Sequence, residues 1–172
     1  WSVCDKIPNR YKWKCLGLDF GFTNDPTALI EVVYCKGELW LNELIYEKRL
    51  TNSDIVSSME ILKVSKSIEI IADSADPKSI FEIQKNGYNI TGAKKGPDSI
   101  NFGLDAMKTY KINITATSQN LIKEFRTYKY VENKTSDRNK PIDFNNHAID
   151  AIRYAATYKI LIPTQEGHSE SF

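Results

Sequence analysis

Three consecutive segments rich in β-branched and aromatic residues constrain the fold of this chain most strongly. They are CLGLDF at 15–20, TALIEVVYC at 27–35 and ELWLNELIYEK at 38–48, with only Lys36 and Gly37 between the second and the third. Such runs are typical of β-strands, and so short a connection is typical of a tight hairpin turn. The sequence therefore predicts an antiparallel meander of three strands.

Helix and strand patterns alternate in the rest of the chain. Apolar spacing and capping residues predict helices at 51–65, 74–87, 97–111, 118–132 and 146–162, with an extended segment around 127–132 as the alternative end of the fourth. The polar residues 133–145, which include Pro141, are expected to form a loop. Further strands are expected at 68–73, at 88–94 and, as a short edge strand, at 112–116. The first of these, IEIIAD, is nearly all apolar, as is typical of a strand covered on both faces. The predicted fold class is therefore α/β: a mixed β-sheet, made of the three-strand antiparallel meander plus parallel strands, flanked by helices on both faces.

Length and composition predict one folded domain. The chain has 172 residues, of which 41% are hydrophobic and 26% charged, unlike a disordered protein. We expect the domain at 15–162, a linker or N-terminal arm at 1–14 and a disordered tail at 163–172. Because the first residue is Trp and not Met, we expect a piece of a longer protein. No apolar run approaches the ~20 residues that span a bilayer, so we expect no membrane partner.

Two of the acidic residues stand where apolar strands end. Asp19 closes or interrupts the strand at 15–20, and Asp73 ends the strand at 68–73. If these strands are neighbours in the sheet, the two carboxylates meet at one edge. A single aspartate in such a place is most often an ordinary turn residue.

A third acid, Asp150, lies among apolar residues of the last predicted helix. Burying its charge without a partner would be expensive, so it needs a cation or a salt bridge. One alternative is an ion pair with Arg153, three residues further along the helix. His147 is three residues before Asp150 and projects from the same helical face.

Three converging carboxylates repel one another in a medium of low dielectric constant, and divalent cations remove that repulsion. Ligation by oxygen alone favours Mg²⁺ or Mn²⁺ over zinc. Two such ions roughly 4 Å apart can bind both the attacking and the leaving oxygen of a phosphoryl displacement. Asp19, Asp73 and Asp150 are therefore the candidate metal ligands and, together with His147, the candidate catalytic residues.

Several other residues could support such a site. His147 could orient the attacking water or transfer a proton, or it could simply hydrogen-bond to the preceding loop. Gly21 has no side chain to block the approach of a phosphate. Asp25 and Asp143 are candidate outer-shell groups, although Asp25 before Pro26 is also an ordinary turn residue.

Four segments in this order and spacing carry a family resemblance. LDFGFTNDPTAL, IIADSADPKSI, AKKGPDSI and NHAIDAIRYA resemble the C-terminal nuclease domain of the large terminase subunit of tailed bacteriophages. The resemblance covers residues 15 to 160 and implies the ribonuclease H-like fold. It also implies a two-metal carboxylate cluster that cuts double-stranded viral DNA during genome packaging, with little sequence specificity. Carried over by motif, the cluster is Asp19, Asp73 and Asp150, with His147 beside it.

The resemblance also implies partners and a location. The chain contains no G-x-x-x-x-G-K-[ST] phosphate loop, so it resembles the nuclease and not the packaging ATPase. The implied partners are an N-terminal ATPase domain of the same chain, the small terminase subunit and the portal, in the host cytoplasm. Two other nucleases of this fold, ribonuclease H and junction resolvases, stay open as alternatives. A non-catalytic DNA-binding or assembly module of the packaging machine is a further alternative.

Net charge does not indicate the substrate by itself. The total is +1, from 23 basic and 22 acidic residues, so the distribution of charge matters more than the sum. Salt-sensitive binding to DNA phosphates is expected from the locally dense basic residues. These are Lys94, Lys95, Lys129, Lys134, Arg138 and Lys140.

Overall fold

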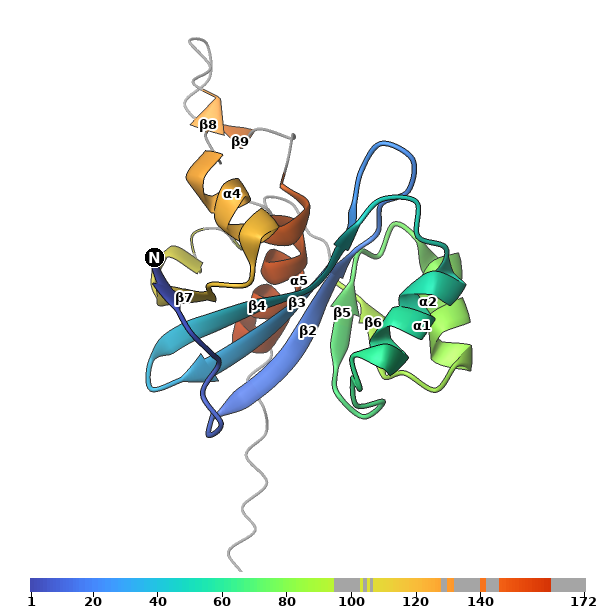
Figure 1. The fold of residues 1–172 in the computed structure, drawn as a ribbon, viewed down its shortest axis with the longest axis horizontal. Helices are drawn as coiled ribbons and strands as arrows, with labels where there is room; N and C mark the ends of the chain where they lie inside the picture. Colours follow the sequence, from blue (N-terminus) through green and yellow to red (C-terminus); the bar gives the residue numbers. More distant parts are fainter. Residues whose placement is uncertain are drawn as a thin grey trace, which may run out of the picture.

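A seven-stranded mixed sheet forms the centre of the molecule (Figure 1). Its strand order is β1-β7-β4-β3-β2-β5-β6. The computed structural model describes residues 1–94, 103, 105, 107–127, 130–131, 140–141 and 146–161. Most of the helix predicted at 97–111 and the tail predicted at 163–172 lie outside these residues.

The three strands of the predicted meander are confirmed. β2 (Trp13–Asp19) pairs antiparallel with β3 (Thr27–Cys35), and β3 pairs antiparallel with β4 (Glu38–Glu47). The β3–β4 turn consists of Lys36 and Gly37, both with positive φ, of 50° and 82°. Positive φ at both central positions is the geometry of a two-residue hairpin turn whose twist matches the strands.

Parallel strands extend the sheet beyond β2, also as predicted. β5 (Ile70–Ala72) pairs parallel with β2, and β6 (Ile90–Gly92) pairs parallel with β5. All residues of β5 are buried, as its apolar composition indicated. Parallel neighbours end at the same edge of the sheet, so the residues that follow β2 and β5 lie side by side.

Two helices cover one face of this region. α1 (Asn52–Ile61) begins with a capping box between Thr51 and Asp54. α2 (Pro77–Lys85) begins after Asp76, whose side chain accepts a hydrogen bond from the Ser79 backbone. Both pack against an apolar cluster that includes side chains of β2 and β5. Figure 1 shows α1 and α2 together on one side of the sheet.

The far edge of the sheet differs from the prediction. β7 (Lys111–Thr115) was expected to be an edge strand, but it pairs with β4 on one side and with β1 (Ser2–Cys4) on the other. Part of the segment predicted as a linker or arm is therefore a strand of the sheet. β1 is short and mostly exposed, without the apolar run that marks β5, so the sequence did not indicate it.

α5 (His147–Leu161) covers the other face, beside α4 (Gln119–Thr127). The Cys15 thiol lies 4.0 Å from the Ala155 carbonyl oxygen. A Cβ atom added at Gly17 would stand 1.8 Å from the carbonyl oxygen of Ala151. The absence of a side chain at Gly17 thus allows the backbone of α5 to rest directly on β2.

The helix predicted at 118–132 ends early in the structure, and a strand lies within the extended segment that was the alternative for 127–132. α4 ends at Thr127, and β8 (Tyr130–Val131) forms a separate two-stranded sheet with β9 (Lys140–Pro141). β9 lies within the segment expected to be a loop. No helix in the described part of the chain is long and apolar enough to cross a membrane.

Candidate active site

The contact between β2 and α5 positions the first pair of site residues. Gly17 and Asp19 are two residues apart on β2 and face the same side of the sheet, the side covered by α5. Ala151 lies over Gly17, and His147 is one helical turn before Ala151. Two residues of strand advance ~6.6 Å and one helical turn ~5.4 Å, so His147 comes level with Asp19. The two side chains meet, with His147 Nδ1 3.0 Å from Asp19 Oδ2.

Asp19 is a buried carboxylate close to other acids. Its exposed fraction is only 7%. Burial raises its pKa most, the hydrogen bond with His147 acts in the opposite direction, and the charges of Asp150 and Asp73 raise it further. Asp19, Asp73 and Asp150 therefore share one electrostatic environment.

Asp73 reaches this environment through the sheet. β2 and β5 are paired neighbours, and the Asp73 backbone N–H donates to the Leu18 carbonyl at 3.1 Å. Asp19 and Asp73 therefore follow adjacent parallel strands at the same edge. The Asp73 carboxylate also accepts a hydrogen bond from the backbone of Ala75 at 2.9 Å, which closes the turn before α2.

Asp150 is held by its own helix. Nε and Nη2 of Arg153 both lie 3.0 Å from Asp150 Oδ1. Asn146 donates to Asp150 Oδ2 at 3.1 Å. The ion pair with Arg153, one of the two explanations open from the sequence, is therefore present. It fixes the direction of a carboxylate whose charge still acts on Asp19.

Tyr154 lies beside the same three acids and was not singled out from the sequence. Its ring is 5% exposed and packs against Ile71 of β5. Burial raises the pKa of its hydroxyl most, followed by the charges of Asp19, Asp150 and Asp73. The hydroxyl therefore lies where the fields of all three carboxylates overlap.

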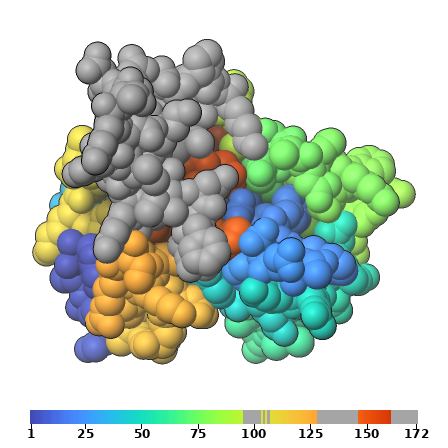
Figure 2. Space-filling view, turned by 90° about the horizontal axis from the view of Figure 1, so that it is seen from above, coloured from blue at the N-terminus to red at the C-terminus, as the bar shows by residue number. Residues whose placement is uncertain are grey.

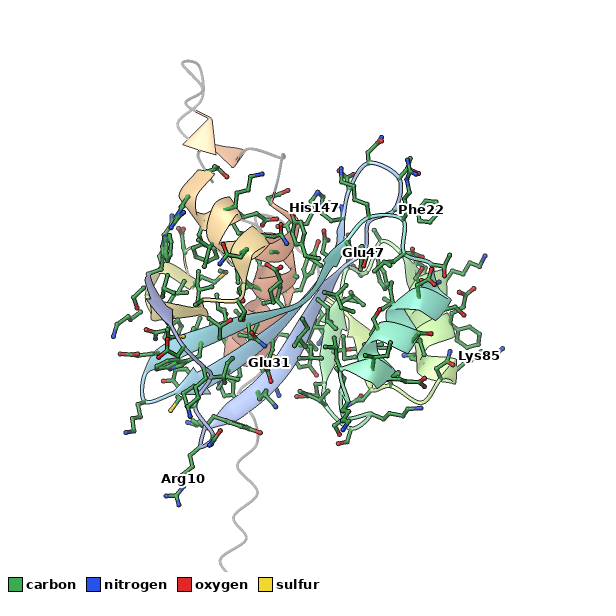
Figure 3. All side chains as sticks on the ribbon, viewed as in Figure 1. Arg10, Phe22, Glu31, Glu47, Lys85 and His147 are labelled. Atoms are coloured by element: carbon green, nitrogen blue, oxygen red, sulfur yellow. The ribbon has the colours of Figure 1, made fainter. Side chains whose placement is uncertain are left out.

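His147 connects two carboxylates on different segments. Its Nδ1 contacts Asp19, and its Nε2 lies 3.4 Å from Asp25 Oδ1. Figure 3 labels His147 at the start of α5. The hydrogen bond to Asp19 raises the pKa of the imidazole most, whereas partial burial lowers it. Two acidic neighbours thus favour the protonated ring, which donates from both nitrogens.

The loop that carries Asp25 is held tightly. Thr27 donates to the Gly21 carbonyl at 3.0 Å and accepts from the Gly21 N–H at 3.2 Å. A Cβ atom at Gly21 would stand 2.4 Å from the carbonyl oxygens of both Asp25 and Pro26. From the sequence, Gly21 was expected to allow phosphate access, but the structure gives it a steric role in this loop.

Glu124 of α4 is a further site residue that was not predicted from the sequence. It is only 2% exposed. Its carboxylate accepts hydrogen bonds from the backbone N–H groups of Ala148 at 3.1 Å and Ile149 at 3.0 Å, and from the Tyr46 hydroxyl at 2.8 Å. It satisfies N–H groups that the first turn of α5 leaves without helical partners. The available signal was a glutamate on the apolar side of an amphipathic helix, three residues after Leu121.

The donor set suits a hard divalent cation, but the side chains are engaged with protein groups. Asp19, Asp73 and Asp150 offer only oxygen ligands, as Mg²⁺ and Mn²⁺ prefer. Within the described residues, however, no three His, Cys, Asp or Glu side chains are arranged to hold a metal ion. Metal binding would require these carboxylates to turn from, or share, their present hydrogen-bond partners.

Only part of the predicted DNA-binding set can be placed. Lys94 is exposed just beyond β6, two strands from β2 at the edge that carries the acids. Lys140 belongs to β9. The other predicted residues of the site lie outside the described residues: Lys95, Lys129, Lys134, Arg138 and Asp143.

The sheet topology, with carboxylates at the ends of β2 and β5 and on the helix across them, defines a ribonuclease H-like protein. Residues 19–157 match the family described as Terminase RNAseH like domain. The chain belongs to this family.

Curated relatives are large terminase subunits. The chain is 37% identical over 153 residues to the large terminase subunit of Bacillus phage SPP1, covering 81% of this chain and 34% of that protein. It is 28% identical over 144 residues to the PBSX phage terminase large subunit of Bacillus subtilis, covering 81% and 33%. The chain thus spans about a third of the length of these relatives.

Solved structures support the same fold. The SPP1 large terminase nuclease domain with bound Mn has a TM-score of 0.77 and 29% identity, over 92% of this chain and 95% of that one. The nuclease of phage G20c with bound magnesium has a TM-score of 0.65 over 89% and 84% of the chains. Its 16% identity supports the fold alone.

Proposed function

We propose that this chain is a metal-dependent endonuclease that hydrolyses double-stranded viral DNA during genome packaging, with little sequence specificity. One observation carries the proposal: Asp19 is buried at the sheet edge within the fields of Asp73 and Asp150. Such crowding of charge is characteristic of functional sites. The 37% identity to the SPP1 large terminase supports the reaction class.

Asp19, Asp73 and Asp150 would hold two Mg²⁺ or Mn²⁺ ions. Such ions supply charge stabilisation for the attacking and leaving oxygens of a phosphodiester. The bound Mn in the SPP1 nuclease domain supports this choice of metal. Asp25 and Asp143 are proposed as outer-shell groups.

The remaining side chains would orient these ligands. Arg153 fixes the direction of the Asp150 carboxylate, and Glu124 holds the first turn of α5, on which both His147 and Asp150 stand. His147, between Asp19 and Asp25, is placed to hold or transfer a proton beside the reacting phosphate.

The rest of the packaging machine is also part of the proposal. An ATPase domain of the same protein would precede this chain, as the greater length of the relatives permits. The small terminase subunit and the portal would present the DNA, in the host cytoplasm. Residues 1–14 would lead from the ATPase domain into this one, with β1 already part of the sheet.

Plasmid cleavage in the presence of Mn²⁺ or Mg²⁺ tests the proposal. We expect Asp19→Asn, Asp73→Asn and Asp150→Asn each to abolish cutting. Asp105→Asn is the matched control, because Asp105 is exposed and pairs only with nearby Lys108 among the described residues. Cutting by all three site variants would contradict the assignment.

Competition between substrates distinguishes this function from those of other nucleases with the same fold. We expect plasmid to be cut in preference to an RNA–DNA hybrid or a four-way junction. Preference for the hybrid would indicate a ribonuclease H, and preference for the junction a resolvase. Calorimetry that detected no binding of Mn²⁺ or Mg²⁺ would instead indicate a non-catalytic module.

A further inference from the structure

A cavity of about 510 Å³ adjoins the candidate active site. It lies between the loop at 20–26, the end of β4 and the outer side of α4. We call it the α4 groove. Figure 2 shows α4 in orange and the β2–β3 loop in blue on either side of the red start of α5. Its lining residues include Asn24, Asp25, Lys48, Asn120, Lys123 and His147.

The α4 groove opens onto the proposed catalytic residues. His147 belongs to its wall, and the Nδ1 atom of the same ring lies 3.0 Å from Asp19 Oδ2. A ligand in the groove would therefore be separated from Asp19 by a single imidazole ring.

The charged side chains that line the α4 groove without an ion pair or a hydrogen bond to another described residue are lysines. Lys48 and Lys123 are exposed, and neither forms an ion pair with any residue that the structure describes. The acidic groups are already engaged, because Asp25 faces His147 and Glu124 accepts three hydrogen bonds. Two ammonium groups on different segments thus face one hollow, an arrangement suited to a ligand with repeated negative charges.

The position of Lys48 sets a distance from the acids. Lys48 directly follows β4, which runs parallel to β2 with β3 between them, so it lies at the same sheet edge as Asp19. Two strand spacings amount to ~10 Å. A DNA strand lying along this edge would therefore place a phosphate beside Lys48 only a few nucleotides from the phosphate at Asp19.

We propose that the α4 groove binds the phosphodiester backbone of the DNA a few nucleotides from the cut, with Lys48 and Lys123 contacting phosphates. Exposed Lys94 stands at the corresponding distance on the other side of Asp19, beyond β6. The backbone would then run along the sheet edge, across the carboxylates. This inference rests on the proposed nuclease function and adds a strand path to it.

Binding measured against salt tests the α4 groove without requiring cleavage. A short fluorescein-labelled DNA duplex of mixed sequence would be titrated in EDTA at several NaCl concentrations, with fluorescence anisotropy as the readout. We expect Lys48→Gln/Lys123→Gln to weaken binding by about tenfold at moderate salt. The slope of log affinity against log salt should flatten by about 1.8, for two lost phosphate contacts.

The matched control removes the same charge elsewhere. Lys36 lies in the β3–β4 turn at the opposite end of the sheet, and Lys85 points away from the body beyond α2 (Figure 3). Lys36→Gln/Lys85→Gln should bind DNA with the wild-type slope. If both double variants showed the same slope of log affinity against log salt, the proposed DNA-binding role of the α4 groove would be wrong. If the wild type still cut plasmid with Mn²⁺ in that case, the proposed nuclease function would be unaffected. A wild-type chain that neither bound nor cut DNA would overturn both proposals.

Discussion

Gly17 occupies the point where the backbones of β2 and α5 touch. A Cβ atom there would lie 1.8 Å from the Ala151 carbonyl oxygen, which is a backbone atom and cannot rotate away. We expect Gly17→Ala to push α5 outward and to lower the free energy of unfolding by about 3 kcal/mol. Urea denaturation would measure the loss, and plasmid cleavage should fall with it because His147 and Asp19 separate.

Gly37 provides the comparison for that variant. A Cβ atom added there would meet no other atom of the described residues within 4 Å, and Asn adopts a positive φ such as this 82° more often than most residues with a side chain. Gly37→Asn should therefore lose only the stability that the positive φ costs, less than Gly17→Ala loses, and should cut DNA as the wild type does. A Gly17→Ala protein as stable as this control would show that α5 does not depend on the close contact.

Glu124 acts on the site through the first turn of α5. Glu124→Gln keeps the size of the side chain but leaves one oxygen to accept from two backbone N–H groups and one hydroxyl. We expect a loss of about 1–3 kcal/mol in unfolding free energy. Single-turnover cleavage should also slow while the affinity for Mn²⁺ changes little, since no proposed ligand is altered.

Tyr46→Phe separates the hydrogen bond that Glu124 accepts from a side chain from the two that it accepts from the backbone of α5. It removes only the hydroxyl that donates to this carboxylate and leaves both backbone contacts. Its cleavage rate should stay close to that of the wild type. If Glu124→Gln and Tyr46→Phe slowed cleavage equally, the role assigned to the first turn of α5 would be wrong.

The candidate site could be predicted from sequence only where a residue type conflicts with its surroundings. Asp19, Asp73 and Asp150 are acids within or at the ends of apolar segments, which is a local signal. Glu124 carries only a weaker signal, its position on the apolar side of α4, because glutamate on a helix is usually solvated. Lys48 and Lys123 line the same groove only because α4 packs beside the end of β4, and no local sequence pattern indicates this arrangement.

Helix α1 offers a test at the scale of one element. Hydrogen bonds from the Thr51 side chain and backbone lower the pKa of Asp54. A carboxyl with a lowered folded-state pKa stabilises the protein above its unfolded-state pKa, and this contribution disappears as the pH falls through the folded-state value. We expect Asp54→Asn to be less stable than the wild type at neutral pH, with the difference vanishing in acid.

Urea unfolding at a series of pH values would check the capping box. Asp105→Asn should show no such convergence with the wild type, because Asp105 lies outside any helix cap that the structure describes. A difference between Asp54→Asn and wild type that persisted below the titration of carboxyl groups would contradict the linkage.

Element length and apolar content together decided which parts of the fold could be predicted. β3 and β4 are nine and ten residues long, so their composition identified them clearly. β1 has three residues, and its pairing with β7 depends on a segment more than a hundred positions away in sequence. Apolar spacing alone does not mark the end of α4 at Thr127, whereas the composition of residues 127–132 already favoured the extended segment in which β8 lies.

At the scale of the whole molecule, metal binding should increase the stability of the folded protein. A cation that binds only the folded carboxylates raises the free energy of unfolding, by about 2.7 kcal/mol at a concentration one hundred times its Kd. We expect Mn²⁺ to raise the melting temperature of the wild type and of Asp105→Asn. Asp19→Asn and Asp73→Asn should lose that increase, and a shift retained by both would place the metal elsewhere.

The close contact between the backbones of β2 and α5 at Gly17 limits where residues can be inserted or deleted in this protein. Substitutions near β2 and α5 leave the alternation of the strand and the turn of the helix intact, whereas an inserted residue does not. One residue added between Gly17 and Asp19 would turn the carboxylate toward α1 and α2. In a library of single-residue insertions and deletions scored for DNA cutting, active variants should therefore be found in the surface loops. None should be found where β2 contacts α5.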